Sequence, residues 1–266
     1  MTKRVDLFDS TYKNFSEGVL DAVRKETYGT DIGQNSWLTV DEYERWLPQL
    51  RLREGEHVLE VASGSGGPAR YLARATRCRV TGIDANESGV ATASALAAEA
   101  GDAGRVTFRV ANAVERLPFE DGSFDGLLCI DSMNHFPNRL DVLREWRRVL
   151  RPGRRALFTD PVVVTGLVTN DELALRSSIG LFVFATAEVN DRLIREAGFR
   201  PIAREDVTEN AALVSGRWYD ARAAREADLV RLEGRERFDG LQCFFDAVRR
   251  LTSERRLSRF AYVVEA

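Results

Sequence analysis

An α/β fold with a doubly wound sheet is predicted from three features of the sequence. A short apolar run at His57–Val61 is typical of a buried strand. The glycine-rich residues 62–67 then form a turn, and Pro68 opens a helix. A second strand, Arg79–Ile83, ends in Asp84, about twenty residues beyond the turn. This order of strand, turn, helix and strand begins a parallel sheet with helical crossovers.

The rest of the chain continues this alternation. Further strands are predicted at Val106–Val110, at Gly126–Ile130, after the R-P-G turn of Trp146–Phe158, at Phe199–Val207 and at Phe260–Val264. Helices are predicted at Glu87–Ala100, at Asn170–Ser178 with Asn170 as N-cap, at Glu188–Ala197 and over the amphipathic segment from about 211 to 256. Alternation of this kind is typical of one large α/β domain.

The glycine-rich turn has the spacing of a nucleotide-binding loop. Gly64, Gly66 and Ala69 match G-x-G-x-x-G/A, which lets a ligand approach bare backbone at the N-terminus of a helix. Asp84 is then placed to accept two hydrogen bonds from the hydroxyls of a ribose. These residues predict an adenosine site. Dinucleotide-dependent enzymes and adenosyl-dependent methyltransferases both use this pattern, so the loop alone leaves both open.

The residues after Asp84 favour the second class. The third strand ends in Ala111–Ala113, the fourth is followed by Asp131–His135, and Trp146–Phe158 supplies a helix, an R-P-G turn and a strand. This order resembles that of the class I S-adenosylmethionine-dependent methyltransferases of the small-molecule type, from about residue 40 to the C-terminus. The resemblance implies a Rossmann-like, seven-stranded sheet whose last strand runs antiparallel. The helical segment at about 210–256 interrupts the short hairpin that is usual between strands 6 and 7, and we interpret it as a cap over the active site.

The resemblance further implies S-adenosyl-L-methionine as the cofactor. In this family the glycine loop holds the methionine part, and the ends of the second, third and fourth strands complete the site. Carried over position by position, the implied contacts are Glu60, Ala62, Ser63, Gly64, Gly66, Asp84, Ala85, Asn86, Asn112, Ala113, Ile130, Asp131 and Ser132. Two positions depart from the family. Ala62 replaces the first glycine, so a negative φ is expected there, and Asn112 replaces the usual aspartate at the adenine.

An N-terminal helical arm, residues 1–45, is predicted to precede a methyltransferase domain at 46–266. Residues 31–43 resemble the segment that folds over the cofactor in the sarcosine/dimethylglycine and isoprenyl-diphosphate methyltransferases. The resemblance implies cofactor contacts from Tyr28, Gln34 and Trp37 and a substrate contact from Tyr12. Trp37 could equally pack the arm onto the domain, because a large ring can bury apolar area and form a wall at once.

His135 is the candidate catalytic residue. It follows the fourth strand at the carboxyl edge of the sheet, where open α/β folds bind ligands, so it could take a proton from an attacking hydroxyl, amine or carbon acid. Its ring could instead only shape the pocket, since methyl transfer needs mainly proximity and exclusion of water. Further candidate substrate contacts are Met133, Asp160 and Arg176, of which Arg176 could meet a carboxylate or phosphate.

Composition excludes several other classes of protein. The formal net charge of −3, without a basic stripe, argues against a nucleic-acid partner. Apolar runs are too short to span a membrane, and the N-terminus lacks a secretory core, so a cytoplasmic protein without a membrane partner is expected. The three cysteines lack metal spacing, and no metal is predicted. No lysine follows Lys25, which excludes a Walker lysine and a Tyr-x-x-x-Lys pair.

The sequence therefore predicts methyl transfer from S-adenosylmethionine to O, N or C of a small-molecule substrate, a metabolite of secondary metabolism. An exposed face of the cap could pair two chains into a homodimer. Two alternatives remain. One is an NAD-dependent oxidoreductase, which the missing Tyr/Lys pair disfavours. The other is a cofactor-binding scaffold without activity, which the departures at Ala62 and Asn112 keep open.

Overall fold

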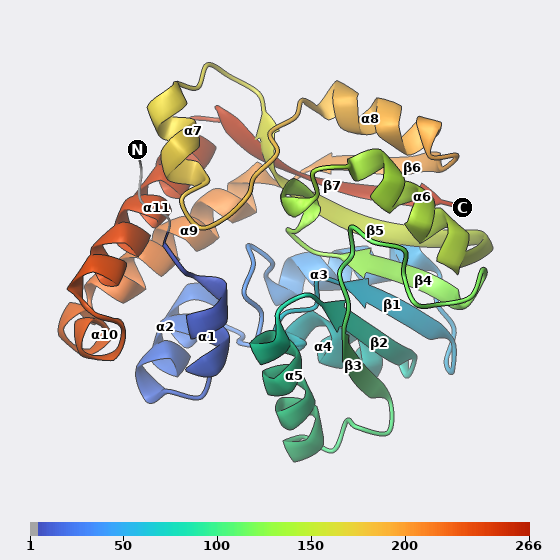
Figure 1. Cartoon of the computed structure of the whole chain (residues 1–266), viewed down its shortest axis with the longest axis horizontal. Helices are drawn as coiled ribbons and strands as arrows, with labels where there is room; N and C mark the ends of the chain where they lie inside the picture. Colours follow the sequence, from blue (N-terminus) through green and yellow to red (C-terminus); the bar gives the residue numbers. More distant parts are fainter. Residues whose placement is uncertain (1–4) are drawn as a thin grey trace.

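A seven-stranded mixed sheet forms the core of this computed structural model, which describes residues 5–266 (Figure 1). Its strands are β1 (His57–Val61), β2 (Arg79–Asp84), β3 (Val106–Val110), β4 (Phe124–Cys129), β5 (Leu150–Val164), β6 (Arg200–Asp206) and β7 (Leu257–Glu265). They lie in the order β3-β2-β1-β4-β5-β7-β6. The strands β1 to β5 are parallel, whereas β7 runs antiparallel to both β5 and β6. The predicted Rossmann-like sheet with an antiparallel last strand is confirmed.

Helices cover both faces of the sheet, because successive strand side chains point to opposite faces. The covering helices are α3 (Val40–Trp46), η1 (Leu47–Leu50), α4 (Gly67–Thr76), α5 (Glu87–Glu99), α6 (Arg139–Val149) and α8 (Ala187–Glu196). In β1, Leu59 joins the apolar cluster around Trp146 of α6, and Val58 joins the cluster around Trp46 of α3. This burial on both sides explains the nearly continuous apolar run of β1. No helix within residues 5–266 is long and apolar enough to cross a membrane.

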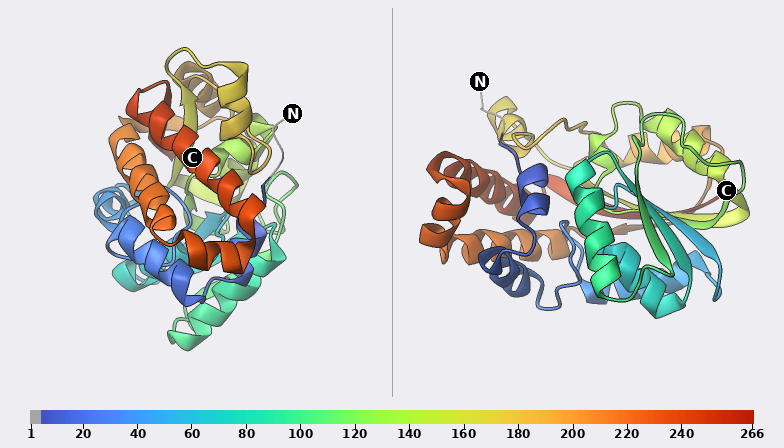
Figure 2. Two further views of the ribbon diagram at one scale, coloured as in Figure 1. Left: turned by 90° about the vertical axis from the view of Figure 1, so that its left-hand side faces the viewer. Right: turned by 60° about the horizontal axis from the view of Figure 1, so that its bottom comes forward.

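The N-terminal arm and the C-terminal helices pack together beside the sheet (Figure 2). The elements are α1 (Phe8–Lys13), α2 (Gly18–Tyr28), α7 (Asn170–Arg176), α9 (Thr208–Ala223), α10 (Glu226–Glu233) and α11 (Arg235–Ser253). Their shared core includes Tyr28 and Trp37 from the arm and Trp218 and Phe245 from α9 and α11. The ring centroids of Trp37 and Trp218 lie 5.7 Å apart. The arm therefore supplies part of the core of the C-terminal helices.

The N-cap of α7 differs from the prediction. Thr169, not Asn170, caps the helix, and it forms a reciprocal capping box with Glu172. The Glu172 carboxylate also pairs with Arg250 and with Arg256, each at 2.8 Å. A side chain three residues into the helix can return to the cap, whereas Asn170 already lies inside the helix. These contacts tie α7 to α11 through Arg250 and to the turn before β7 through Arg256.

Candidate active site

A cavity of about 460 Å³ opens at the carboxyl ends of the parallel strands. Parallel strands end at one edge of a sheet, so the residues that follow them gather there. The predicted site residues that line this cavity are Tyr12, Glu60, Ala62, Ser63, Gly64, Asp84, Ala85, Asn86, Asn112, Ala113, Ile130, Asp131, Ser132 and His135. The fold thus brings residues from the arm and from four strand ends to one cavity.

Asp84 ends β2 and holds the glycine loop. Its Oδ2 accepts a hydrogen bond from the backbone N–H of Gly64, and its Oδ1 accepts one from Asn86, both at 2.8 Å. Burial raises the pKa of Asp84, while these backbone hydrogen bonds lower it. Each carboxylate oxygen has more than one lone pair, so both can also accept a hydroxyl from a ligand. Asp84 therefore fixes the loop and presents a carboxylate suited to a diol.

Glu60 lies near the end of β1 and is a buried acid with one unpaired oxygen. Glu60 is 2% exposed, and its Oε2 has no hydrogen-bond partner within residues 5–266. Burial raises the pKa of Glu60 to about 8, although the backbone N–H of Ala69 opposes this shift. A buried carboxylate is costly without a partner. Glu60 therefore fits a ligand that brings a positively charged hydrogen-bond donor.

The backbone at Ala62 corrects the expectation of a negative φ. Its φ is +57°, and Asp131, after β4, has a φ of +53°. Two hydrogen bonds fix the sharp turn. The N–H of Ser63 donates to the carbonyl of Ile83 (3.0 Å), and the N–H of Gly66 donates to the carbonyl of Ser63 (2.8 Å). A residue with a Cβ adopts this conformation at a cost of about 1–2 kcal/mol. The wall of the cavity therefore contains strained backbone at two strand ends.

Asn112 lies on the exposed rim of the cavity. Its Oδ1 accepts the N–H of Val114 (3.2 Å), and its Nδ2 donates to Glu115 (2.9 Å). Val114 also lines the cavity and is 42% exposed. The neutral amide thus shapes the turn after β3 and leaves an apolar side chain uncovered beside it. Such a rim suits the flat face of an adenine.

The first helix of the arm covers the glycine loop. The hydroxyl of Tyr12 lies so close that a Cβ at Gly64 would be 2.5 Å from it. Burial raises the pKa of Tyr12 well above its usual value, so the phenol stays protonated. Two hydrogen bonds join α1 to α5, from Ser88 to Asp9 (2.8 Å) and from Thr92 to the backbone of Tyr12 (3.0 Å). The arm therefore contributes directly to the cavity.

Gly67 marks a close approach between the arm and the glycine loop. A Cβ there would lie 2.5 Å from the carbonyl carbon of Gly33, a backbone atom with no freedom to rotate away. We expect Gly67→Ala to lower the free energy of unfolding by about 1–3 kcal/mol, as overpacking does. Gly216→Ala in α9 is the control, since nothing lies within 4 Å of that position and alanine is the better helix former. Equal denaturant midpoints for the two variants would contradict this contact.

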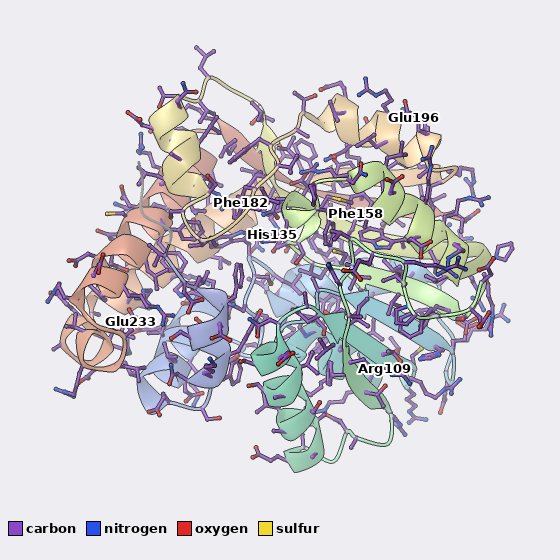
Figure 3. All side chains as sticks on the ribbon, viewed as in Figure 1. Arg109, His135, Phe158, Phe182, Glu196 and Glu233 are labelled. Atoms are coloured by element: carbon purple, nitrogen blue, oxygen red, sulfur yellow. The ribbon has the colours of Figure 1, made fainter. Side chains whose placement is uncertain are left out.

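His135 lies in η2 (Met133–His135), where the large cavity meets a smaller one, and it lines both. Its Nδ1 is 3.0 Å from the carbonyl oxygen of Leu181. A carbonyl only accepts, so Nδ1 carries the hydrogen and the neutral ring keeps an acceptor at Nε2. Burial lowers the pKa of His135 to about 4. The ring of Phe8 packs edge-on against it, at 5.5 Å between centroids. Phe182 does the same at 4.9 Å (Figure 3). His135 is therefore a neutral base held in one tautomer.

The smaller cavity, of about 40 Å³, is lined mainly by aromatic rings. Trp37 and Arg176 line this cavity rather than the larger one. The N–H of Trp37 donates to Oδ2 of Asp131 (2.8 Å), which joins the arm to the end of β4. Asn134 and Phe182 also line it and were not predicted. Asn134 lies in the segment Asp131–His135 that was predicted to follow the fourth strand, so its position after that strand could have indicated it. No local pattern marks Phe182, because the loop after α7 reaches η2 only through tertiary packing.

Five predicted contacts lie outside the lining of both cavities: Tyr28, Gln34, Gly66, Met133 and Asp160. Each is engaged within the protein. The Tyr28 hydroxyl donates to the carbonyl of Ser36 (2.8 Å), and the Gln34 amide bonds to the backbone of the arm. Asp160 is fully buried and pairs with Arg139 at 2.6 Å. Tyr28, Gln34, Met133 and Asp160 are therefore not among the proposed ligand contacts, whereas Gly66 contributes only by shaping the glycine loop.

Comparisons with known proteins agree with this geometry. Residues 59–158 match the family described as a methyltransferase domain. The 27-O-demethylrifamycin SV methyltransferase of Amycolatopsis mediterranei is 36% identical over 169 residues, which span 62% of this chain and 62% of that relative. The O-methyltransferase rstn1 of Aspergillus nomiae is 32% identical over 60% of this chain and 71% of its own. A phosphoethanolamine N-methyltransferase 2 of Haemonchus contortus, solved with S-adenosyl-L-methionine, has a TM-score of 0.78 at 20% identity, covering 98% of this chain and 60% of its own.

This chain belongs to the class I S-adenosylmethionine-dependent methyltransferases, and S-adenosyl-L-methionine is its cofactor. The predicted family and cofactor are confirmed. The residues of the large cavity fit this cofactor. The unpaired Oε2 of Glu60 suits the ammonium group of its methionine part, and the carboxylate of Asp84 suits the two ribose hydroxyls.

Substitution of Glu60 by glutamine should therefore change the stability of the cofactor-free protein and its affinity for the cofactor in opposite directions. A carboxyl whose pKa is raised from 4.5 to about 8 favours the folded state below pH 4.5, and this contribution is lost as the pH rises to about 8. Glu60→Gln removes the buried charge, so the cofactor-free variant should lose less stability over this pH range. The same variant should bind S-adenosylhomocysteine about tenfold more weakly, because the charged hydrogen bond is lost. Thermal unfolding at several pH values measures the change in stability, and calorimetry measures the change in affinity. Stability and affinity that both rose, or both fell, would contradict the assignment.

Proposed function

We propose that this protein transfers the methyl group of S-adenosylmethionine to a hydroxyl oxygen of a small metabolite in secondary metabolism. The observation that carries this proposal is the position of His135, a neutral base that lines both the cofactor cavity and the small aromatic cavity. An acceptor in the small cavity would lie beside the base and in front of the cofactor. Two of the relatives described above are named as O-methyltransferases or as acting at an O-methyl position.

The proposed roles divide between holding the cofactor and handling the acceptor. Glu60, Asp84 and the glycine loop would bind the cofactor, which supplies an electrophilic methyl group on a sulfonium sulfur when bound. His135 would accept the hydroxyl proton at Nε2 as the oxygen attacks. The rings of Phe8 and Phe182 would keep water from the reacting atoms, so most of the rate enhancement would come from proximity.

The arm of residues 1–45 and the cap at about 210–256 are proposed to enclose the acceptor together. Trp37 of the arm and Trp218 of the cap pack ring against ring, and both line the small cavity. The hydrogen bond from Trp37 to Asp131 fastens this cover to the sheet. A cavity closed in this way would hold one end of a small acceptor, with the rest of the acceptor in the larger cavity that holds the cofactor.

The test begins with calorimetric titration of the protein with S-adenosylhomocysteine and with NAD. We expect binding of the first only. Methyl-labelled S-adenosylmethionine would then be incubated with a panel of phenols, amines and carbon acids, and label should pass to a phenol. Binding of NAD in place of S-adenosylhomocysteine would contradict the proposal in favour of an oxidoreductase. Cofactor binding without transfer to any acceptor class would instead favour a scaffold.

A further inference from the structure

Arg176 is a buried cation without a hydrogen-bond partner. It ends α7 and is 2% exposed, yet its side chain makes no hydrogen bond or ion pair with any of residues 5–266. Its guanidinium instead lies 4.8 Å from the ring centroid of Phe182 and 5.2 Å from that of Phe244. Burial lowers its pKa to about 9. Five N–H donors without an acceptor carry a large desolvation cost.

The carboxylates that act on Arg176 are already used by other groups. Asp160 accepts from Arg139 at 2.6 Å and from Asn190 at 2.9 Å. Asp131 accepts from Arg259 at 2.7 Å and from the N–H of Trp37 at 2.8 Å. Both carboxylates attract Arg176 through space, but neither bonds to it. Asp131 also lines the small cavity. Because both carboxylates bond to other groups, the N–H donors of the guanidinium have no acceptor within the described residues and are available to a ligand.

A second unpaired group lies in the same cavity. Asn134 is 1% exposed, and neither its Nδ2 nor its Oδ1 has a hydrogen-bond partner within the described residues. Its own backbone is fixed, because its carbonyl accepts the N–H of Val183 at 2.8 Å. Asn134 and Arg176 both line the small cavity. Nδ2 of Asn35, which also lines this cavity, is a further buried atom without a partner among the described residues. Buried polar groups are normally paired, so unpaired groups gathered in one cavity suit a ligand with complementary chemistry.

The size of the cavity and its walls limit that partner. A volume of about 40 Å³ has room for roughly three water-sized groups, since one needs about 10–15 Å³. A carboxylate is of this size, and its two oxygens match a guanidinium and an amide N–H. Trp37, Phe182 and Phe244 supply ring faces and edges around it. Aromatic walls of this kind pack well against an aromatic ring.

We propose that the acceptor is a small aromatic acid, whose carboxylate binds Arg176 and Asn134 while its ring extends past His135 toward the cofactor cavity. This inference rests on the proposed methyl transfer, because it assigns the small cavity to the acceptor. His135 lines both cavities, so a hydroxyl on the ring would pass beside the base. Arg176 and Asn134 would then determine which acceptors bind, without taking part in the chemistry.

The test compares benzoate with its neutral isostere benzamide by calorimetry on the protein saturated with S-adenosylhomocysteine. Benzoate should bind about 10- to 150-fold more tightly, the range of charged hydrogen bonds. Arg176→Met should bring the ratio close to one, and Arg176→Lys should keep part of it. Binding of S-adenosylhomocysteine should be unchanged in both variants, which separates the acceptor site from the cofactor site.

Two further variants keep the test decisive. Asn134→Asp would give Arg176 an internal carboxylate and should abolish the preference for benzoate even if Arg176→Met does not fold. Arg249→Met is the matched control, because that arginine also lies over a ring, Tyr219 at 4.4 Å, but outside both cavities. It should keep the wild-type ratio.

The outcomes separate this inference from the proposed function. Failure of S-adenosylhomocysteine to bind would overturn the proposed function, while benzoate titrations of the cofactor-free protein would still report on the small cavity. Equal binding of benzoate and benzamide with intact cofactor binding would overturn the acceptor assignment alone. So would a preference for benzoate that survives Arg176→Met, or tighter binding of phenyl phosphate than of benzoate.

Discussion

Replacement of His135 by alanine is expected to lower kcat by about 10²- to 10⁴-fold, with the dissociation constant of S-adenosylhomocysteine nearly unchanged. The physical reason is the fixed tautomer. Nδ1 donates to the carbonyl of Leu181, so Nε2 is the atom that can take a proton. The carboxylate of Asp84 and the buried acid Glu60 hold the cofactor without help from this ring. Steady-state kinetics and calorimetry on the same variant measure both quantities.

The pH dependence gives a second measurement on His135. Because burial lowers its pKa to about 4, the ring stays neutral well below the usual value of 6.5. The acidic limb of the kcat/KM profile should therefore fall near pH 4 rather than near 6.5. The same shift has a consequence for folding. Stability contributed by the neutral ring is present above pH 6.5 and is lost as the pH falls toward 4, because the unfolded chain takes up the proton more readily.

The second histidine provides a control. His57 starts β1, bonds to the hydroxyl of Thr81 at 2.9 Å and packs against Phe124, outside both cavities. His57→Ala should leave kcat unchanged. If His135→Ala raised only the KM for the acceptor and left kcat unchanged, the ring would form a wall of the site and not act as a base. If neither constant moved, another group would accept the proton, and the assignment of His135 would be wrong.

Asp84→Ala is expected to weaken the binding of S-adenosylhomocysteine by about 1.5–3 kcal/mol, or roughly 10- to 150-fold. Two effects combine in this variant. The ribose hydroxyls lose a charged acceptor, and the N–H groups of Gly64 and Asn86 lose the oxygens that fix the loop. Isothermal titration calorimetry measures the change in affinity.

Two further variants help to explain the loss of affinity in Asp84→Ala. Asp84→Asn keeps an acceptor oxygen without the charge, so its affinity should lie between those of the wild type and Asp84→Ala. Asp228→Ala is the control, because that aspartate pairs with Arg231 on the exposed helix α10. It should bind like the wild type. An unchanged dissociation constant for Asp84→Ala would remove Asp84 from the cofactor site.

Most residues that line the cofactor cavity could be predicted from the sequence. Asp84 was predicted from its place at the end of a strand, and Glu60 and Asn112 were predicted from the resemblance to the family; all three line the cavity. Local hydrogen bonds were harder to predict from the sequence. The positive φ of Ala62 depends on bonds to residue 83 and within the turn, and the cap of α7 depends on which neighbour the Glu172 carboxylate selects. These choices follow from geometry that a residue pattern does not record.

The sequence by itself determined the sheet, the family and the cofactor cavity, because strand periodicity, glycine spacing and strand-end residues are local features with fixed spatial consequences. Only the tertiary structure decided the acceptor side. Trp37, Asn134, Arg176 and Phe182 come from an arm, a strand end, a helix and a loop that are far apart in the chain. Their meeting depends on how the arm and the C-terminal helices pack over the sheet. Within residues 5–266, burial there left the amide of Asn134 without a partner and enclosed the guanidinium of Arg176 among aromatic rings. Such a combination is a property of the assembled cavity rather than of any segment.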